Sequence, residues 1–170
     1  RLTWSQEADS AFELIKQDVM SMTSLRYPDN SLPFTLTTDE SNIAIGAVLM
    51  QVRDNNPEPL EFYSNKLSSP QTRYSTFDRE LLGLFLSVKH FEYMLIRRSS
   101  TVYTDHKPLI QIFQMKNPSP RQQRQISYLS QFDIEVKFIS GADNVVADCF
   151  SRVELAALEF ESYLSQEALE

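Results

Sequence analysis

The chain lacks the features that would mark a secreted or membrane protein. It contains one cysteine, Cys149, in 170 residues, which excludes a disulfide framework within the chain and suits a reducing compartment. No apolar run reaches about 18 residues, and no charged-then-apolar leader is present. We therefore predict no membrane partner. The chain opens on Arg1 rather than Met, so we expect an excerpt or a processed product.

An excess of positive charge is also missing. The formal net charge is −7, whereas proteins that bind nucleic acid usually display a basic surface. Of the 23 acidic residues, five lie within residues 153–170, which contain no Lys or Arg, so residues 1–152 carry 18 acidic and 16 basic residues. The acidity argues against a nucleic-acid partner without excluding one, because several of these carboxylates are candidate metal ligands.

The hydrophobic pattern predicts one globular domain of mixed α and β structure, since 42% of the residues are hydrophobic. An opening helix is expected to about residue 22. Three strands are expected at residues 34–39, 43–52 and 59–64, and their short connections favour an antiparallel meander.

A helix is predicted from Ser75 to about Ile96, because Ser75 and Asp78 form a capping-box signature and an apolar stripe follows. Glu80 lies at the edge of that stripe. A strand at 101–105 follows the helix and is therefore predicted to run parallel to an earlier strand. Further elements are expected as follows: helices at 108–115 and 121–131, a strand at 132–139, and a helix from residue 144. The predicted order is βββαβ(αα)βα.

Four carboxylates are the candidate catalytic residues: Asp39, Glu80, Asp105 and Asp148. Asp39 and Asp105 each close a predicted strand, and the parallel crossover would bring them side by side. Mg²⁺ prefers oxygen ligands and is usually bound by a few carboxylates together with substrate phosphates. The four residues therefore predict a metal-dependent site for phosphoryl transfer.

Six ordered blocks of sequence resemble the ribonuclease H domain of gypsy-type retrotransposon polyproteins. A shorter likeness, to the segment that joins reverse transcriptase to this domain, covers residues 2–4, 11–12 and 25–29. The six blocks are TTDES at residues 37–41, IGAVL at 45–49, YSNKL at 63–67, YSTFDRELL at 74–82, YTDHKPL at 103–109 and NVVADCFSR at 144–152.

The resemblance implies a ribonuclease H-like fold, with a five-stranded mixed sheet flanked by helices. It divides the chain into a reverse transcriptase junction (1–30), a ribonuclease H domain (31–152) and an acidic tail or linker (153–170). The implied partners are an RNA–DNA hybrid and the reverse transcriptase domains of the same polyprotein. The implied location is the cytoplasm, within virus-like particles, with the nucleus as an alternative.

The implied activity is hydrolysis of the RNA strand of the hybrid with two Mg²⁺ ions, which Mn²⁺ can replace. Asp39 would hold both ions, Asp148 the ion that activates the attacking water, and Glu80 with Asp105 the ion at the leaving 3′-oxygen. Two ions roughly 4 Å apart stabilise both the entering and the departing oxygen of an in-line displacement.

Two departures from the family pattern stand beside the proposed ligands. Glu40 occupies a position that is commonly small, where its carboxylate either perturbs metal binding or points away along the strand. Residues 140–144 contain no histidine, although many cellular and retroviral relatives carry one before the last aspartate. In those relatives the histidine assists proton transfer or product release. Without it, either solvent would perform that step or turnover would be slower.

Other interpretations stay open. An inactive domain kept for packing, dimerisation or partner binding, as a polyprotein spacer or in a host gene, is the main alternative. A third interpretation is another nuclease or transposase-like member of the same architecture, and the order of the acidic residues argues against it. An integrase-type site would need its Glu late in the chain, and a proofreading-exonuclease site would need an acidic residue where Ser41 stands. Individual residues also have plainer roles. Asp148 could pair with Arg152, His106 and Lys107 could serve local structure or contact phosphate, and Arg121 and Arg124 could contact phosphate or face solvent.

Overall fold

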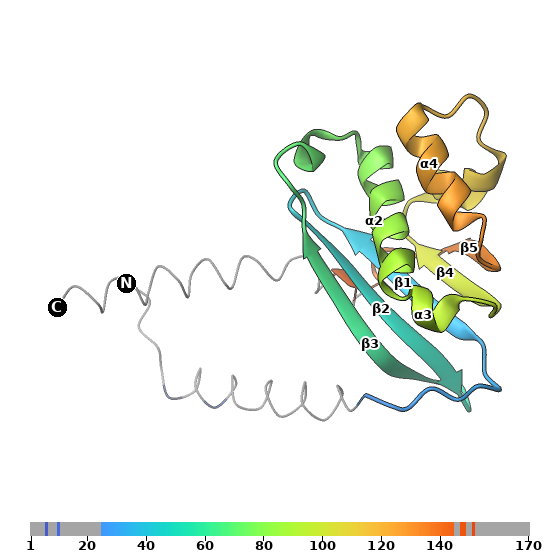
Figure 1. Cartoon of the computed structure of the whole chain (residues 1–170). Coiled ribbons are helices and arrows are strands. Elements are labelled where there is room, and N and C mark those ends of the chain that lie inside the picture. Colours follow the sequence, from blue (N-terminus) through green and yellow to red (C-terminus); the bar gives the residue numbers. More distant parts are fainter. Residues whose placement is uncertain (1–5, 7–9, 11–24, 145–146, 149–150, 152–170) are drawn as a thin grey trace.

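A computed structural model of the chain describes residues 6, 10, 25–144, 147–148 and 151 (Figure 1). The predicted opening helix lies outside these residues except for Gln6 and Ser10, which are helical. The acidic tail at 153–170 lies outside them entirely, and the predicted division of the chain into three parts stays a prediction. Among the described helices, none is long and apolar enough to cross a membrane.

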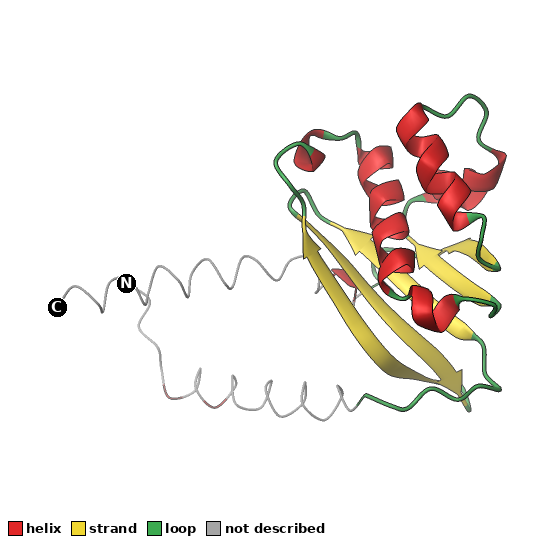
Figure 2. Ribbon diagram, in the orientation of Figure 1, coloured by secondary structure: helices red, strands yellow, loops and turns green. Residues whose placement is uncertain are grey.

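Five strands form one mixed sheet, in the spatial order β3-β2-β1-β4-β5 (Figure 2). The pairs β1–β2 and β2–β3 are antiparallel, and the pairs β1–β4 and β4–β5 are parallel. The predicted fold class, the meander and the parallel crossover are therefore confirmed. The strands are β1 (Phe34–Glu40), β2 (Ala44–Arg53), β3 (Asn56–Lys66), β4 (Ser100–Thr104) and β5 (Ile134–Phe138).

The turn between β2 and β3 is tighter than the predicted turn at residues 54–57. Only Asp54 and Asn55 lie between the strands, with φ of 51° and 64°. Two residues with positive φ match the right-handed twist of the strands they join. The third strand consequently begins at Asn56 and includes Pro57 and Pro59, which β3 tolerates because it is an edge strand.

Two of the helices, α2 (Thr76–His90) and α4 (Pro120–Leu129), lie side by side over one face of the sheet (Figures 1 and 2). The predicted cap of α2 is confirmed, because the Ser75 side chain accepts a hydrogen bond from the Asp78 backbone N–H. The prediction of one helix to Ile96 was wrong in detail. The helix breaks at Phe91 (φ −90°, ψ 13°), and the short helix α3 (Glu92–Leu95) follows.

The remaining elements correspond to the predictions with small shifts. A short stretch of 3-10 helix, η1 (Gln71–Arg73), precedes α2. A second stretch, η2 (Lys107–Gln114), precedes α4 and stands where an α-helix was expected. The core fills the space between the sheet and the helices. Its fully buried large side chains include Phe34, Leu36, Leu49, Leu81, Leu84, Phe91, Leu95, Leu109, Ile112 and Leu129.

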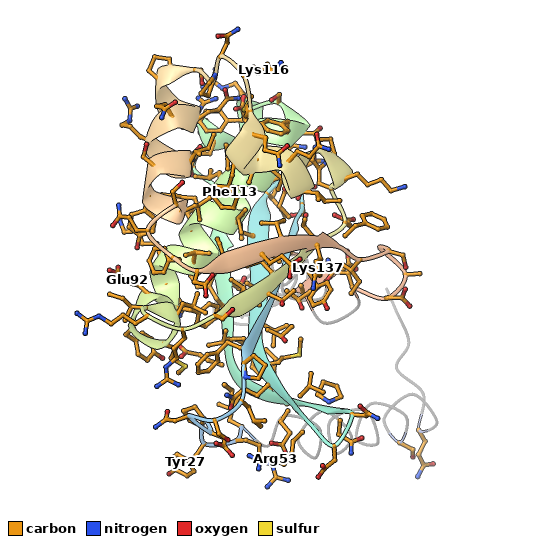
Figure 3. All side chains as sticks on the ribbon, turned by 90° about the vertical axis from the view of Figure 1, so that its right-hand side faces the viewer. Tyr27, Arg53, Glu92, Phe113, Lys116 and Lys137 are labelled. Atoms are coloured by element: carbon orange, nitrogen blue, oxygen red, sulfur yellow. The ribbon has the colours of Figure 1, made fainter. Side chains whose placement is uncertain are left out.

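The carboxyl end of β1 lies away from the β2–β3 turn. Arg53, beside that turn, and Tyr27 lie at one end of the molecule, and Lys116 in the connection from η2 to α4 lies at the other (Figure 3). The register pairs Asp39 with Gly46, at the opposite end of β2 from Arg53. The carboxyl end of β1 lies toward the end of the sheet where α2 begins (Figure 1), and Asp39 is the next-to-last residue of that strand.

Gly83 in α2 gives a first prediction. A Cβ added there would lie 3.7 Å from Ile45 Cγ2 and 3.9 Å from Glu40 Cβ, which are ordinary van der Waals distances. Because glycine costs a helix interior about 1 kcal/mol relative to alanine, Gly83→Ala is expected to raise the free energy of unfolding by about 0.5 to 1 kcal/mol. Urea denaturation measures this change. A loss of stability would show that helix and sheet approach more closely than these distances allow.

Candidate active site

The parallel pairing of β1 and β4 places two of the predicted carboxylates level with each other. Thr37 of β1 pairs with Tyr103 of β4. Asp39 lies two residues after Thr37, and Asp105 lies two residues after Tyr103. The Thr38 hydroxyl also donates to the Tyr103 carbonyl at 3.5 Å. The prediction that these two aspartates end neighbouring parallel strands is therefore confirmed.

Strand alternation separates Asp39 from Glu40. Glu40 pairs with Ile45, which packs against Leu82 of α2, so Glu40 faces the helices. Adjacent residues of a strand point to opposite faces of a sheet, and Asp39 accordingly meets Asn144 and Ser151 instead. Glu40 does not point away from the other carboxylates, because its side chain is only 4% exposed and is hydrogen-bonded to Glu80. Its effect on metal binding stays a prediction.

Glu80 lies in the first turns of α2 and is 9% exposed, as its place at the edge of the apolar stripe predicts. Burial raises the pKa of Glu80 to about 7; the charges of Asp105 and Asp39 act in the same direction, while the hydrogen bond with Glu40 opposes them. The electrostatic influence of both aspartates shows that Glu80 belongs to the same acidic cluster.

Glu40 is the most strongly perturbed carboxyl group of this cluster. Burial raises its pKa to about 10, with further contributions from the Glu80 charge and from a hydrogen bond to Glu80. Arg79 offsets part of this effect, with Nε 3.8 Å from Glu40 Oε1. Burial and the neighbouring carboxylate thus favour a protonated Glu40, which donates a hydrogen bond to Glu80.

His106 borders the cluster from the loop after β4. Its Nδ1 lies 3.6 Å from Glu80 Oε1, and its ring packs 5.9 Å from that of Phe77. Burial lowers the pKa of His106, while the Asp105 charge opposes this shift. The backbone N–H of His106 donates to the Thr104 hydroxyl at 3.1 Å. These contacts support the local structural role that the sequence analysis considered.

The segment that carries Asp148 returns to the end of β1. The Asp148 backbone N–H donates to the Asn144 carbonyl at 3.1 Å, and residues 147, 148 and 151 are helical, as predicted. Asn144 and Ser151 both bond to Asp39. Asp148 thus lies between two residues that contact the first aspartate. Cys149 and Arg152 lie outside the described residues.

The structure separates the two arginines of α4. Arg121 pairs with Asp78, with Nη2 3.0 Å from Oδ2, and its guanidinium lies 3.8 Å from the centre of the Tyr74 ring. Arg124 is exposed to solvent. Lys107 lies 4.8 Å from the centre of the Phe138 ring. Arg121 therefore has a structural role that its spacing in the sequence did not reveal.

The donor chemistry of the cluster fits Mg²⁺, because it consists of carboxylate oxygens, the ligands that this ion prefers. Within residues 25–144, 147–148 and 151, however, no three His, Cys, Asp or Glu side chains stand around one point as a ready ligand set. Glu80 is bonded to Glu40, and Asp39 to Ser151 and Asn144. Metal binding would therefore require at least Glu80 to exchange its present partner.

Comparison with known proteins identifies the class. Residues 29–132 match the family described as the RNase H-like domain found in reverse transcriptase. This match covers more than half of the chain, and the chain belongs to this family.

The similar curated proteins are retrotransposon polyproteins. The chain is 35% identical over 156 residues to the retrovirus-related Pol polyprotein from transposon 412 of Drosophila melanogaster, covering 92% of the chain and 13% of that protein. It is 34% identical over 163 residues to the transposon Tf2-3 polyprotein of Schizosaccharomyces pombe, covering 90% of the chain and 12% of the polyprotein. The chain thus spans about an eighth of the length of these relatives and is an RNase H-like domain of the retrotransposon type.

Solved structures confirm the fold. The native prototype foamy virus protease-reverse transcriptase superposes with a TM-score of 0.61 at 12% identity, over 82% of this chain and 19% of that one. The N-terminal RNase H domain of a Mycobacterium tuberculosis protein gives a TM-score of 0.56 at 17% identity, over 77% of this chain and 99% of that one. At these identities the likeness shows the ribonuclease H-like fold alone.

Proposed function

We propose that this chain is a metal-dependent endonuclease that hydrolyses the RNA strand of RNA–DNA hybrids during reverse transcription of a retrotransposon. The observation that carries the proposal is the position of Asp39 and Asp105, each two residues beyond the paired Thr37 and Tyr103, with Glu80 under the electrostatic influence of both aspartates. Three carboxylates from distant parts of the sequence thereby share one end of the sheet, and the segment that holds Asp148 returns to the same place.

In this proposal Asp39, Glu80, Asp105 and Asp148 would hold two Mg²⁺ ions: Asp39 would contribute to both, Asp148 to one, and Glu80 with Asp105 to the other. The bound ions would supply charge stabilisation at the entering and departing oxygens. Attack of water on the phosphorus and departure of the 3′-oxygen leave a 3′-hydroxyl and a 5′-phosphate. Glu80 must exchange the hydrogen bond from Glu40 for the metal ion and be deprotonated to act as a ligand, because metal ligands bind in the deprotonated form.

The proposed partners are an RNA–DNA hybrid and the reverse transcriptase domains of the same polyprotein. Two structures of similar fold support the hybrid, because each is a complex with an RNA/DNA hybrid: LC11-RNase H1, with a TM-score of 0.53, and the foamy viral protease-reverse transcriptase, with a TM-score of 0.55. Selection of RNA would require contact with the 2′-hydroxyl in the minor groove. The proposed location is the cytoplasm, within virus-like particles.

A cleavage assay tests the proposal. A hybrid labelled on the RNA strand is incubated with the full chain, alone and joined to its polymerase, with Mg²⁺, with Mn²⁺ and with EDTA. We expect cutting of the RNA strand only with a divalent ion, and no cutting of duplex DNA. Absence of metal-dependent cutting by the joined protein would exclude the nuclease.

One observation favours a second candidate, a domain that serves packing or partner binding without catalysis. Glu40 donates a hydrogen bond to Glu80, the only proposed ligand supplied by α2. If this pair persists in the presence of metal, the site stays incomplete. The same assay decides between the two functions, because this module would bind its polymerase and leave the hybrid intact.

Asp148→Asn should impair the enzyme without abolishing it. Because Asp148 would serve one ion and Asp39 both, we expect hydrolysis with Mg²⁺ to fall to about a hundredth of the wild-type rate, with a remainder that Mn²⁺ makes easier to detect. Rates under single-turnover conditions, with both ions, measure the effect. Wild-type activity in this variant would remove Asp148 from the site.

A further inference from the structure

We propose that Ser151 is a positioning residue, which fixes the carboxylate of Asp39 and docks the segment that carries Asp148. This inference rests on the proposed function, because it assigns Ser151 a task in the proposed metal site. The resemblance that located the four carboxylates assigns no role to Ser151. Its contacts in the folded chain provide the argument.

Ser151 has the burial and the bonds of a fixed residue. Its exposed fraction is 0%, and its hydroxyl donates to Asp39 Oδ2 at 2.7 Å. A bond to a carboxylate is stronger than a bond between neutral groups, so Asp39 is favoured over the Asp148 carbonyl, which lies 2.9 Å from the same hydroxyl. The Ser41 hydroxyl donates to the Ser151 carbonyl at 2.8 Å, which ties the segment to the residue after β1.

The other carboxylate oxygen of Asp39 has a donor from the same segment. The Asn144 side-chain amide lies 3.4 Å from Asp39 Oδ1 and 3.1 Å from the Thr38 carbonyl. Asn144 is 2% exposed. Bonds to both oxygens restrict rotation of the carboxylate, so Asn144 and Ser151 together set the direction of its lone pairs.

Asp148 is placed by the same two contacts. It follows Asn144 by four residues and precedes Ser151 by three, and these spacings put residues on one face of a helix. Fixing both flanking residues to the end of β1 therefore determines where the backbone of Asp148 lies. Ser151 thus connects two of the four proposed ligands without being one itself. Groups that orient metal ligands commonly change metal affinity by about 10-fold to 100-fold when they are removed.

The first part of the test needs no metal and no substrate. Ser151→Ala, Asp39→Ala and the double variant of the full chain are unfolded with urea in EDTA. We expect the two substitutions to be coupled, with an interaction equivalent to about a tenfold change in the unfolding equilibrium constant. Additive effects would overturn the proposed bond, whatever the protein does with metal.

The second part tests the consequence. Calorimetric titration with Mg²⁺ is expected to give a dissociation constant about tenfold higher for Ser151→Ala than for wild type. Ser87→Ala is the matched control, because Ser87 is equally buried and its hydroxyl has no hydrogen-bond partner among the described residues. Equal Mg²⁺ affinity in Ser151→Ala and wild type would overturn the positioning role. A wild-type protein with intact coupling that binds no Mg²⁺ would overturn the proposed function, and the positioning role with it.

Discussion

Hydrolysis of the RNA strand is expected to fall below about a thousandth of the wild-type rate in Asp39→Asn, because this residue would hold both ions and stabilise both reacting oxygens. The substitution preserves the shape of the side chain, and Asn can still accept the hydrogen bond from Ser151. Lost activity with retained folding is therefore the diagnostic result, measured by single-turnover cleavage and by circular dichroism.

Asp133→Asn is the matched control for this experiment. Asp133 is exposed and lies just before β5, so its replacement is expected to leave the rate unchanged. Equal rates in the Asp39 variant, the control and the wild-type protein would remove Asp39 from the site.

The second large effect concerns stability and pH in the absence of metal. Burial and the Glu80 charge raise the pKa of Glu40 from 4.5 to about 10. The folded protein then keeps a proton that the unfolded chain releases above pH 4.5. Stability from this group is therefore fully present below pH 4.5 and falls as the pH rises toward 10. The pKa of Glu80 is raised to about 7. Glu80 therefore adds a smaller loss of stability, in the same direction, between pH 4.5 and 7.

Glu40→Gln removes this dependence, since glutamine carries no titrating proton. In EDTA we expect the variant to exceed the wild-type free energy of unfolding by about 3 kcal/mol at pH 8 and by less than about 1 kcal/mol at pH 5. The loss of the Arg79 contact reduces the gain somewhat. Urea denaturation across this pH range measures it. The exposed Glu135 offers the control Glu135→Gln, and a gain in Glu40→Gln that does not change with pH would contradict the prediction.

Much of the fold could be predicted because its signals are local. Periodicity and the Ser75 cap located α2, and the requirement for a helical crossover predicted the parallel strand β4. The break at Phe91 and the tight Asp54-Asn55 turn were missed. At both places the local sequence is compatible with more than one set of backbone torsion angles. The set that is adopted depends on the packing of the whole domain, which the sequence pattern does not show.

The site could be predicted in part. Three of the four carboxylates lie where strand ends and a helix stripe placed them, but the partner of Glu80 did not follow from the sequence. Strand alternation shows that Glu40 and Asp39 face opposite ways, yet only the packing of β1 against α2 shows that Glu40 turns inward. The contacts of Asn144 and Ser151 with Asp39 were also missed, because they join residues more than 100 positions apart.

The pairing of β1 with β4 also has a consequence for biogenesis. Thr38 and Tyr103, which contact each other across this pair, lie 65 residues apart along the chain, and the loop between them must close before the aspartates meet. A nascent chain that ends before β4 carries Asp39 and Glu80 without Asp105. The acidic cluster therefore assembles only after β4 has been synthesised, and a translation product that ends before Asp105 cannot contain it.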